Sequence, residues 1–156
     1  MTTESKAGAG DNGAPLVTLH RWEEFCAAHR LYDERMSKEE NEALYGPCAR
    51  AFGHGHNYRI GVSVRGAVDP RTGMVVNLVQ IKKAVQELIV DDMDHRNLNH
   101  DSQLMKGINP TAENIVVKCW EVLHAVFGEL LEEVIIEESP RNSVSYCGQR
   151  AAKPAA

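Results

Sequence analysis

The chain lacks any uninterrupted apolar segment of the roughly 20 residues that a membrane-spanning helix requires. Its N-terminus also lacks the basic segment followed by an apolar one that is typical of a signal peptide. Positive charge is not in excess either, because 22 Asp and Glu residues outnumber 17 Lys and Arg residues and give a formal net charge of -5. These absences predict a cytoplasmic protein whose main partner is neither nucleic acid nor a membrane.

Cysteine is also scarce, with four residues in the chain. Two disulfides are possible in number, but without an export signal we expect a reducing compartment and consider each cysteine separately. Cys119 lies in a helical apolar pattern, while Cys26 and Cys147 lie in strand-like segments, so we expect all three to pack in the core. Cys48 directly follows Gly46-Pro47 and has neighbours that suggest chemistry.

What the chain does contain is enough apolar material for one folded domain. Hydrophobic residues make up 43% of its 156 residues, and a chain of this length buries roughly two thirds of its unfolded surface. Residues 1–15 are small, polar and glycine-rich, and they predict a disordered tail. We expect residues 16–149 to form the domain and residues 150–156 to form a C-terminal tail.

The segment from His54 to Val64 alternates strictly between two kinds of residue. Its even positions are His, His, Tyr, Ile, Val and Val, and its odd positions are Gly, Asn, Arg, Gly and Ser. This period of two predicts a strand with one buried face. Because alternate side chains of a strand share a face, His54 and His56 should lie on that buried face, about 6.6 Å apart along the chain.

Periodicity and turn chemistry predict the other elements. Ser37-Lys38-Glu39-Glu40 is typical of a capping box at the start of a short helix that ends near Tyr45. The remaining predicted elements are a strand over 16–29, a hairpin return at 74–76, a helix over 78–90, a polar loop over 91–109, a helix from Thr111 to Gly128, and strands over 134–138 and 143–146. This order predicts an α+β domain, in which two helices cover one face of a four-stranded antiparallel sheet. Its open sheet edges favour oligomerisation.

A third histidine makes the pair on the strand a candidate metal site. His29, at the end of the preceding strand, can stand beside His54 and His56 across the sheet. Three imidazoles with an open fourth position are typical of catalytic zinc. The alternative is a closed structural zinc site, with Cys48 as the fourth ligand.

Two acidic residues are further candidates. Asp94-His95 is a possible acid–base pair, although adjacent side chains in a strand point apart. Glu138 shares strand parity with Val134 and Ile136, so it should point inward. A carboxylate on an apolar face needs a donor, which an amidine-like ligand edge or a core arginine would supply.

Several motifs, in order along about residues 17–149, resemble the 6-pyruvoyl-tetrahydropterin synthase family. They are Phe25-Cys-Ala-Ala-His29-Arg-Leu, Leu44-Tyr-Gly-Pro-Cys48, His54-Gly-His56-Asn-Tyr, Asp69-Pro-Arg-Thr-Gly-Met74, Asp94-His95-Arg-Asn-Leu98, Thr111-Ala-Glu-Asn114 and Glu138. The resemblance implies a tunnelling fold (T-fold), in which ββααββ subunits join their sheets around a pore. It also implies a homohexamer of two trimers, with active sites between subunits.

The resemblance further implies a reaction. The substrate would be 7,8-dihydroneopterin triphosphate, converted with loss of triphosphate and an internal redox shift in a reaction that depends on zinc and magnesium. By position, the resemblance assigns zinc binding to His29, His54 and His56, proton acceptance to Cys48, a proton relay to His95 with Asp94, and the pterin pocket to Glu138 and Thr111.

Two alternatives remain open beside this activity. The first is 6-carboxy-tetrahydropterin synthase of the queuosine pathway, against which the extra helix at 37–45 and the spacing from Cys48 to His54 argue. The second is a zinc- and pterin-binding oligomer without turnover. The chain departs from the family at Pro47, Ala51 and Phe52, which belong to the loop that aims Cys48. Candidate cations for the triphosphate are Arg30, Arg59, Arg65, Lys82 and Lys106.

Overall fold

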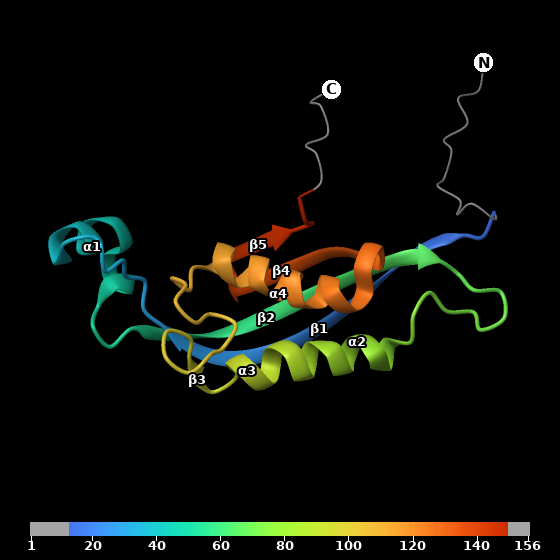
Figure 1. Ribbon diagram of the computed structural model, residues 1–156, viewed down its shortest axis with the longest axis horizontal. Coiled ribbons are helices and arrows are strands. Elements are labelled where there is room, and N and C mark those ends of the chain that lie inside the picture. Colours follow the sequence, from blue (N-terminus) through green and yellow to red (C-terminus); the bar gives the residue numbers. More distant parts are fainter. Residues whose placement is uncertain (1–12, 150–156) are drawn as a thin grey trace, which may run out of the picture.

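The computed structural model describes residues 13–149 (Figure 1). Most of the predicted N-terminal tail and all of the predicted C-terminal tail lie outside the described residues. The strands are β1 (Leu16–His29), β2 (His54–Ala67), β3 (Arg96–Asn97), β4 (Leu131–Ser139) and β5 (Asn142–Tyr146). The helices are α1 (Lys38–Tyr45), α2 (Leu78–Val85), α3 (Asp91–Met93) and α4 (Ala112–Phe127), with short helical turns η1 (Gly46–Ala49), η2 (Gln86–Val90) and η3 (Gly128–Leu130). None of the helices within 13–149 has both the length and the apolar character needed to cross a membrane.

One sheet with the order β3-β1-β2-β4-β5 organises the molecule. The four longer strands pair in antiparallel fashion, as predicted. The fifth strand, β3, has two residues and runs parallel to β1 beside Ala27 and Ala28. The α+β class is therefore confirmed, and the sheet is extended at one edge by a segment that was predicted to be a loop.

Helices α2 and α4 lie on the same face of this sheet, which we call the inner face (Figure 1). The even positions of β2 from Tyr58 to Val64 point to the inner face and are almost completely buried. Cys119 of α4 packs there as predicted, and burial raises the pKa of its thiol to about 12. Leu78 and Val126 were predicted on the buried helix faces, but they are 51% and 55% exposed, and each lines a pocket that is open to the surface.

Local capping explains where the helices begin and end. Ser37 and Glu40 form the predicted capping box at the start of α1. The side chains of Asn77 and Thr111 accept hydrogen bonds from the first turns of α2 and α4. Gly128 ends α4 with a positive φ of 54°, a conformation that glycine adopts without steric cost.

Two sequence predictions were wrong in this part of the chain. Residues 74–76 form no strand, because the side chain of Val75 packs onto the sheet at Gly66 and the next helix begins three residues later. Cys26 is exposed and Cys147 is half-buried, so neither is a core residue. Cys26 points to the face of the sheet that α2 and α4 leave uncovered, which we call the outer face.

Candidate active site

Three histidines meet where β1 ends and β2 begins. The antiparallel register pairs His29 with His54 directly across the two strands, and the alternation of β2 puts His56 on the same inner face. One ligand atom from each imidazole lies within 4.8 Å of the others. The Nε2 atoms of His29 and His54 are 3.1 Å apart. The predicted cluster is therefore assembled by strand pairing alone.

Hydrogen bonding and burial prepare two of these imidazoles, those of His29 and His54, to act as neutral ligands. His29 Nδ1 donates to the carbonyl oxygen of Pro110 at 2.8 Å, which leaves the Nε2 lone pair directed at the cluster. Burial lowers the pKa of His29 and of His54, and the charge of His56 lowers the pKa of His54 further. Among the described residues, His56 Nε2 is a buried nitrogen without a hydrogen-bond partner. Three imidazoles that meet in this way, one of them with an unpartnered nitrogen, fit a bound transition metal.

Glu138 reaches this cluster from β4. Its Oε1 atom lies 3.7 Å from Nε2 of His29 and 3.7 Å from Nε2 of His56. The neighbouring Glu137 points the other way and binds Arg59 at 2.6 Å. Strand parity therefore predicts both directions correctly, although the pairing of β4 with β5 shifts register between Glu137 and Ser139.

A pocket of about 430 Å³ adjoins Glu138. It also contains Thr111, whose hydroxyl caps α4 by accepting a hydrogen bond from Asn114 N at 3.3 Å. The full lining is Leu31, Leu44, Tyr45, Thr111, Ala112, Glu113, Glu138, Asn142, Ser143 and Val144. Sequence reasoning missed the wall formed by Leu44 and Tyr45, because nothing in the sequence indicates how α1 lies against the sheet. A pocket that combines apolar side chains with two carboxylates, those of Glu113 and Glu138, suits a planar polar ring.

Cys48 lies in the turn η1, which is tied to the chain just after His29. The Leu31 amide donates to the Cys48 carbonyl at 2.9 Å, and Arg30 Nε donates to the Ala49 carbonyl at 2.8 Å. These bonds hold the Cys48 backbone beside the segment that follows β1.

Asp94 and His95 form a pair, but they do not join this cluster. Asp94 Oδ2 lies 2.8 Å from His95 Nδ1, and the His95 side chain is 83% exposed. Asp94 Oδ1 accepts from the Cys26 amide at 2.8 Å, and this bond is the main cause that lowers the pKa of Asp94. His95 lines a shallow hollow with Cys26 and Ala28, whose side chains belong to the outer face. Asp94 and His95 therefore pair with each other, and His95 lies on the outer face instead of at the histidine cluster.

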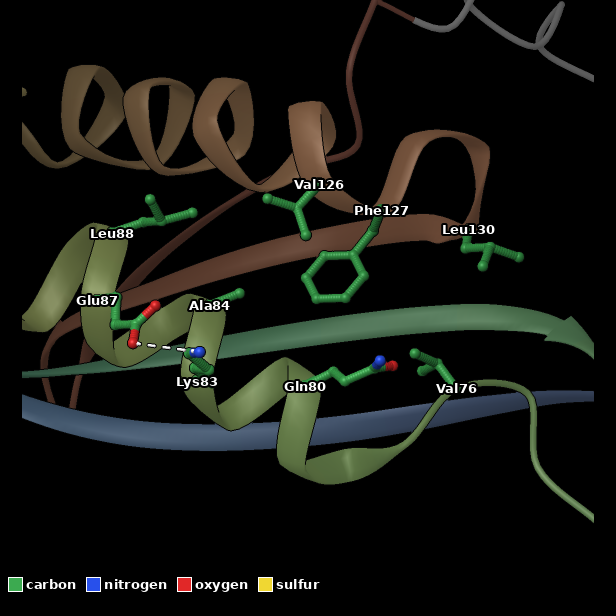
Figure 2. Close-up of a pocket in the computed structure, with 9 residues that line it drawn as sticks. All are labelled: Val76, Gln80, Lys83, Ala84, Glu87, Leu88, Val126, Phe127 and Leu130. Carbon is green, nitrogen blue, oxygen red and sulfur yellow. Dashed lines mark ion pairs between the residues drawn. The ribbon is translucent and has the colours of Figure 1, made fainter. Parts of the chain in front are cut away.

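A separate apolar pocket of about 590 Å³ lies between α2 and the end of α4 (Figure 2). Its lining includes Leu88, Val126 and Phe127, and its charged groups are Lys83 and Glu87, which form an ion pair with each other at 3.7 Å. No histidine or cysteine lines it. This pocket therefore contains none of the histidines of the candidate site and does not contain Cys48.

Known proteins share the sequence of this chain over most of its length. The family model described as 6-pyruvoyl tetrahydropterin synthase matches residues 18–149. The 6-pyruvoyl tetrahydrobiopterin synthase of Homo sapiens is 42% identical over 126 residues, which are 80% of this chain and 87% of that protein. The synthase of Poecilia reticulata is 42% identical over 132 residues, which are 84% of this chain and 90% of that protein.

Solved structures agree as well. The Caenorhabditis elegans 6-pyruvoyl tetrahydropterin synthase superimposes with a TM-score of 0.81 and 42% identity, covering 86% of this chain and 97% of that one. The Plasmodium vivax enzyme is 16% identical with a TM-score of 0.58, covers 84% of this chain and 96% of that one, and supports the fold alone. The chain therefore belongs to the 6-pyruvoyl tetrahydropterin synthase family of enzymes, as its sequence motifs predicted.

Proposed function

We propose that this protein is a lyase that converts 7,8-dihydroneopterin triphosphate into 6-pyruvoyl-tetrahydropterin with elimination of triphosphate, a step of tetrahydrobiopterin biosynthesis. The observation that carries the proposal is the position of Glu138, which lies 3.7 Å from two imidazoles and also lines the pocket beside Thr111. A carboxylate there can accept two hydrogen bonds from the amino-pyrimidine edge of a pterin. The ring would then be held with its side chain toward the histidines.

We propose that His29, His54 and His56 hold zinc. The close approach of the three imidazoles and the unpartnered Nε2 of His56 support this assignment. A zinc ion there would supply a Lewis acid that stabilises negative charge on a side-chain oxygen of the substrate. Magnesium would accompany the triphosphate, because Mg²⁺ in proteins is commonly bound through substrate phosphates.

We assign proton transfer to the remaining predicted residues, Cys48 and His95 with Asp94. Cys48, whose backbone is fixed beside the end of β1, is the proposed proton acceptor for the substrate side chain. His95, oriented by Asp94, is the proposed relay. Because His95 belongs to the outer face, we propose that it serves the site of a neighbouring copy in a homohexamer of two trimers. We also expect the protein to work in the cytoplasm.

Product analysis tests the activity. The zinc-loaded protein is incubated with 7,8-dihydroneopterin triphosphate and Mg²⁺, and the products are identified by mass. The pyruvoyl product is expected. The carboxy product together with acetaldehyde would instead indicate 6-carboxy-tetrahydropterin synthase. No consumption of substrate would contradict both activities and leave a zinc- and pterin-binding oligomer.

Variants test the roles of the residues. Cys48→Ala should keep zinc and lose most of the turnover, whereas His54→Ala should lose zinc. Cys147→Ala and His124→Ala are matched controls outside the pocket and should change neither property. An unchanged rate in Cys48→Ala would remove Cys48 from the mechanism.

Mixing variants tests where the sites lie. Cys48→Ala and His95→Ala protein should each be inactive alone. If the two residues come from different copies, oligomers reassembled from both variants should regain activity. Reassembled mixed oligomers that stay inactive would contradict a shared site.

A further inference from the structure

The segment between β1 and β2 forms an arm that extends beyond the sheet. The arm comprises residues 30–49 and contains α1 and the turn η1. Its helix lies past the ends of both strands (Figure 1). The arm carries Tyr45, which lines the pocket beside Glu138, and Cys48, the proposed proton acceptor. The position of the arm relative to the sheet therefore decides where both side chains lie.

Two asparagines of the loop before α4 hold the arm. Asn99 binds its base, because its Oδ1 accepts from the Arg30 amide at 2.7 Å and its Nδ2 donates to the Arg30 carbonyl at 2.9 Å. Asn109 binds the arm further out. Its Oδ1 accepts from the Tyr32 amide at 3.3 Å, and its Nδ2 donates to the hydroxyl of Tyr45, the last residue of α1, at 3.1 Å. One side chain thus ties both the start of the arm and the end of its helix to the loop.

The backbone of Asn109 is itself fixed at the start of α4. Its carbonyl accepts from the Thr111 amide at 2.8 Å and from Nδ2 of Asn114 at 2.8 Å. The next residue, Pro110, is buried, and its carbonyl accepts from His29 Nδ1 at 2.8 Å. Two adjacent residues therefore orient a proposed metal ligand and the arm. A shift of the arm relative to Asn109 is also a shift relative to the histidines.

We propose that Asn109 is a positioning residue, which sets where Tyr45 and Cys48 stand relative to the histidine cluster. A side-chain amide suits this task because it accepts and donates at the same time. The proposal rests on the proposed function, since it takes the pocket as the pterin site and Cys48 as the proton acceptor. Removing the polar atoms of Asn109 should loosen the arm and leave both functional side chains in the chain.

Hydrogen–deuterium exchange tests the attachment of the arm directly. Asn109→Leu has a side chain of similar size without either hydrogen bond, so the amides of α1 should exchange about fivefold faster, the effect expected for one neutral hydrogen bond. Tyr45→Phe removes only the hydroxyl and should accelerate exchange of the same amides. Asn109→Asp should restore most of the protection, because a carboxylate can accept from both the Tyr32 amide and the Tyr45 hydroxyl.

Binding and turnover separate positioning from general damage. Asn109→Leu should weaken the binding of neopterin, followed by its fluorescence, and should also lower kcat, because Tyr45 and Cys48 move with the arm. Its affinity for Zn²⁺ should stay that of the wild type, since the Pro110 carbonyl still orients His29. In a Tyr45→Phe background, Asn109→Leu should weaken neopterin binding by a smaller factor than it does alone, because the two groups share a hydrogen bond.

Asn77→Ala is the matched control. Asn77 caps α2 by accepting from the Val79 amide at 2.9 Å, and α2 begins at the end of the molecule opposite α1 (Figure 1). This variant should lower the free energy of unfolding and change neither the exchange of α1 nor the affinity for neopterin.

Unchanged exchange of α1 in either Asn109→Leu or Tyr45→Phe would overturn the proposal. A weaker affinity of Asn109→Leu for Zn²⁺, or effects of the two substitutions on neopterin binding that simply multiply, would overturn it as well. Exchange does not depend on turnover, so a wild-type protein without lyase activity would contradict the proposed function while the exchange rates still decide how Asn109 holds the arm.

Discussion

Gly53, immediately before the first histidine of β2, is the residue whose replacement should reveal most about the site. Its φ is +65°, a left-handed conformation. A Cβ atom at this position would lie 2.3 Å from the carbonyl oxygen of His29 and 2.9 Å from its carbonyl carbon. Backbone atoms cannot move aside as a flexible side chain can. Gly53→Ala should therefore force β1 and β2 apart where His29 pairs with His54.

The magnitude follows from two contributions. A residue other than glycine in the left-handed region costs about 1–2 kcal/mol. Overpacking against a rigid neighbour costs a further 1–3 kcal/mol, approximately. The free energy of unfolding should thus fall by about 2–5 kcal/mol. Separating the imidazoles of His29 and His54, now 3.1 Å apart at Nε2, should also weaken metal binding about tenfold or more.

Gly73→Ala supplies a matched control. Gly73 has a similar φ of +70°, but a Cβ there would meet nothing within 4 Å. The free energy of unfolding of Gly73→Ala should therefore fall by only about 1–2 kcal/mol, the conformational contribution, and the variant should keep its affinity for metal. Urea unfolding measures the first quantity, and competition with a chelator for Zn²⁺ measures the second. If the two variants behaved alike in both measurements, the close approach of Gly53 to His29 would not be what shapes the site.

Three other predictions concern the rest of the chain. In native protein at pH 8, an Ellman reaction should label the exposed Cys26 quickly and leave Cys119 unlabelled until the protein unfolds. Cys119 resists because burial raises the pKa of its thiol to about 12. Fast labelling of Cys119 would contradict the described core. Ser37→Ala should lower the free energy of unfolding by about 1 kcal/mol in urea melts, since it removes the capping box of α1, and Ser37→Gly should cost less. Without metal, the free energy of unfolding should be highest above pH 6.5 and should decline as the pH falls below that value. The reason is that burial lowers the pKa of His29 and His54 in the folded state, so the unfolded chain binds protons first. Equal urea midpoints at pH 7.5 and 5.5 in EDTA would refute this.

Features encoded by short-range chemistry were predictable from the sequence. The capping box at Ser37, the cap at Thr111 and the stop at Gly128 each depend on a few adjacent residues, and all three are confirmed. The inward direction of Tyr58 and its even-numbered neighbours in β2 follows from a period of two. These elements needed no knowledge of the tertiary structure.

Features that depend on contacts between distant segments were not predictable. Strand β3 has two residues and exists because Arg96 and Asn97 meet the far end of β1, to which no local pattern points. Val75 packs by its side chain over Gly66, which a hairpin prediction from composition could not anticipate. The exposure of Cys26 follows from the face that α2 leaves uncovered, a property of how helix and sheet are assembled.

The candidate site likewise has a part that could be predicted from short-range patterns and a part that could not. The cluster of His29, His54 and His56 could be predicted because one strand pairing and one alternation are sufficient to assemble it. The direction of His95 could not be predicted, because it depends on a left-handed backbone at that residue, with a φ of 57°. A hydrogen bond from the His95 amide to the Cys26 carbonyl oxygen holds this conformation. Such a conformation is uncommon outside glycine and is tolerated where surrounding contacts impose it. His95 therefore lies with Cys26 and Ala28 of the outer face, and this is the physical reason to look for its partner groups in a second copy of the chain.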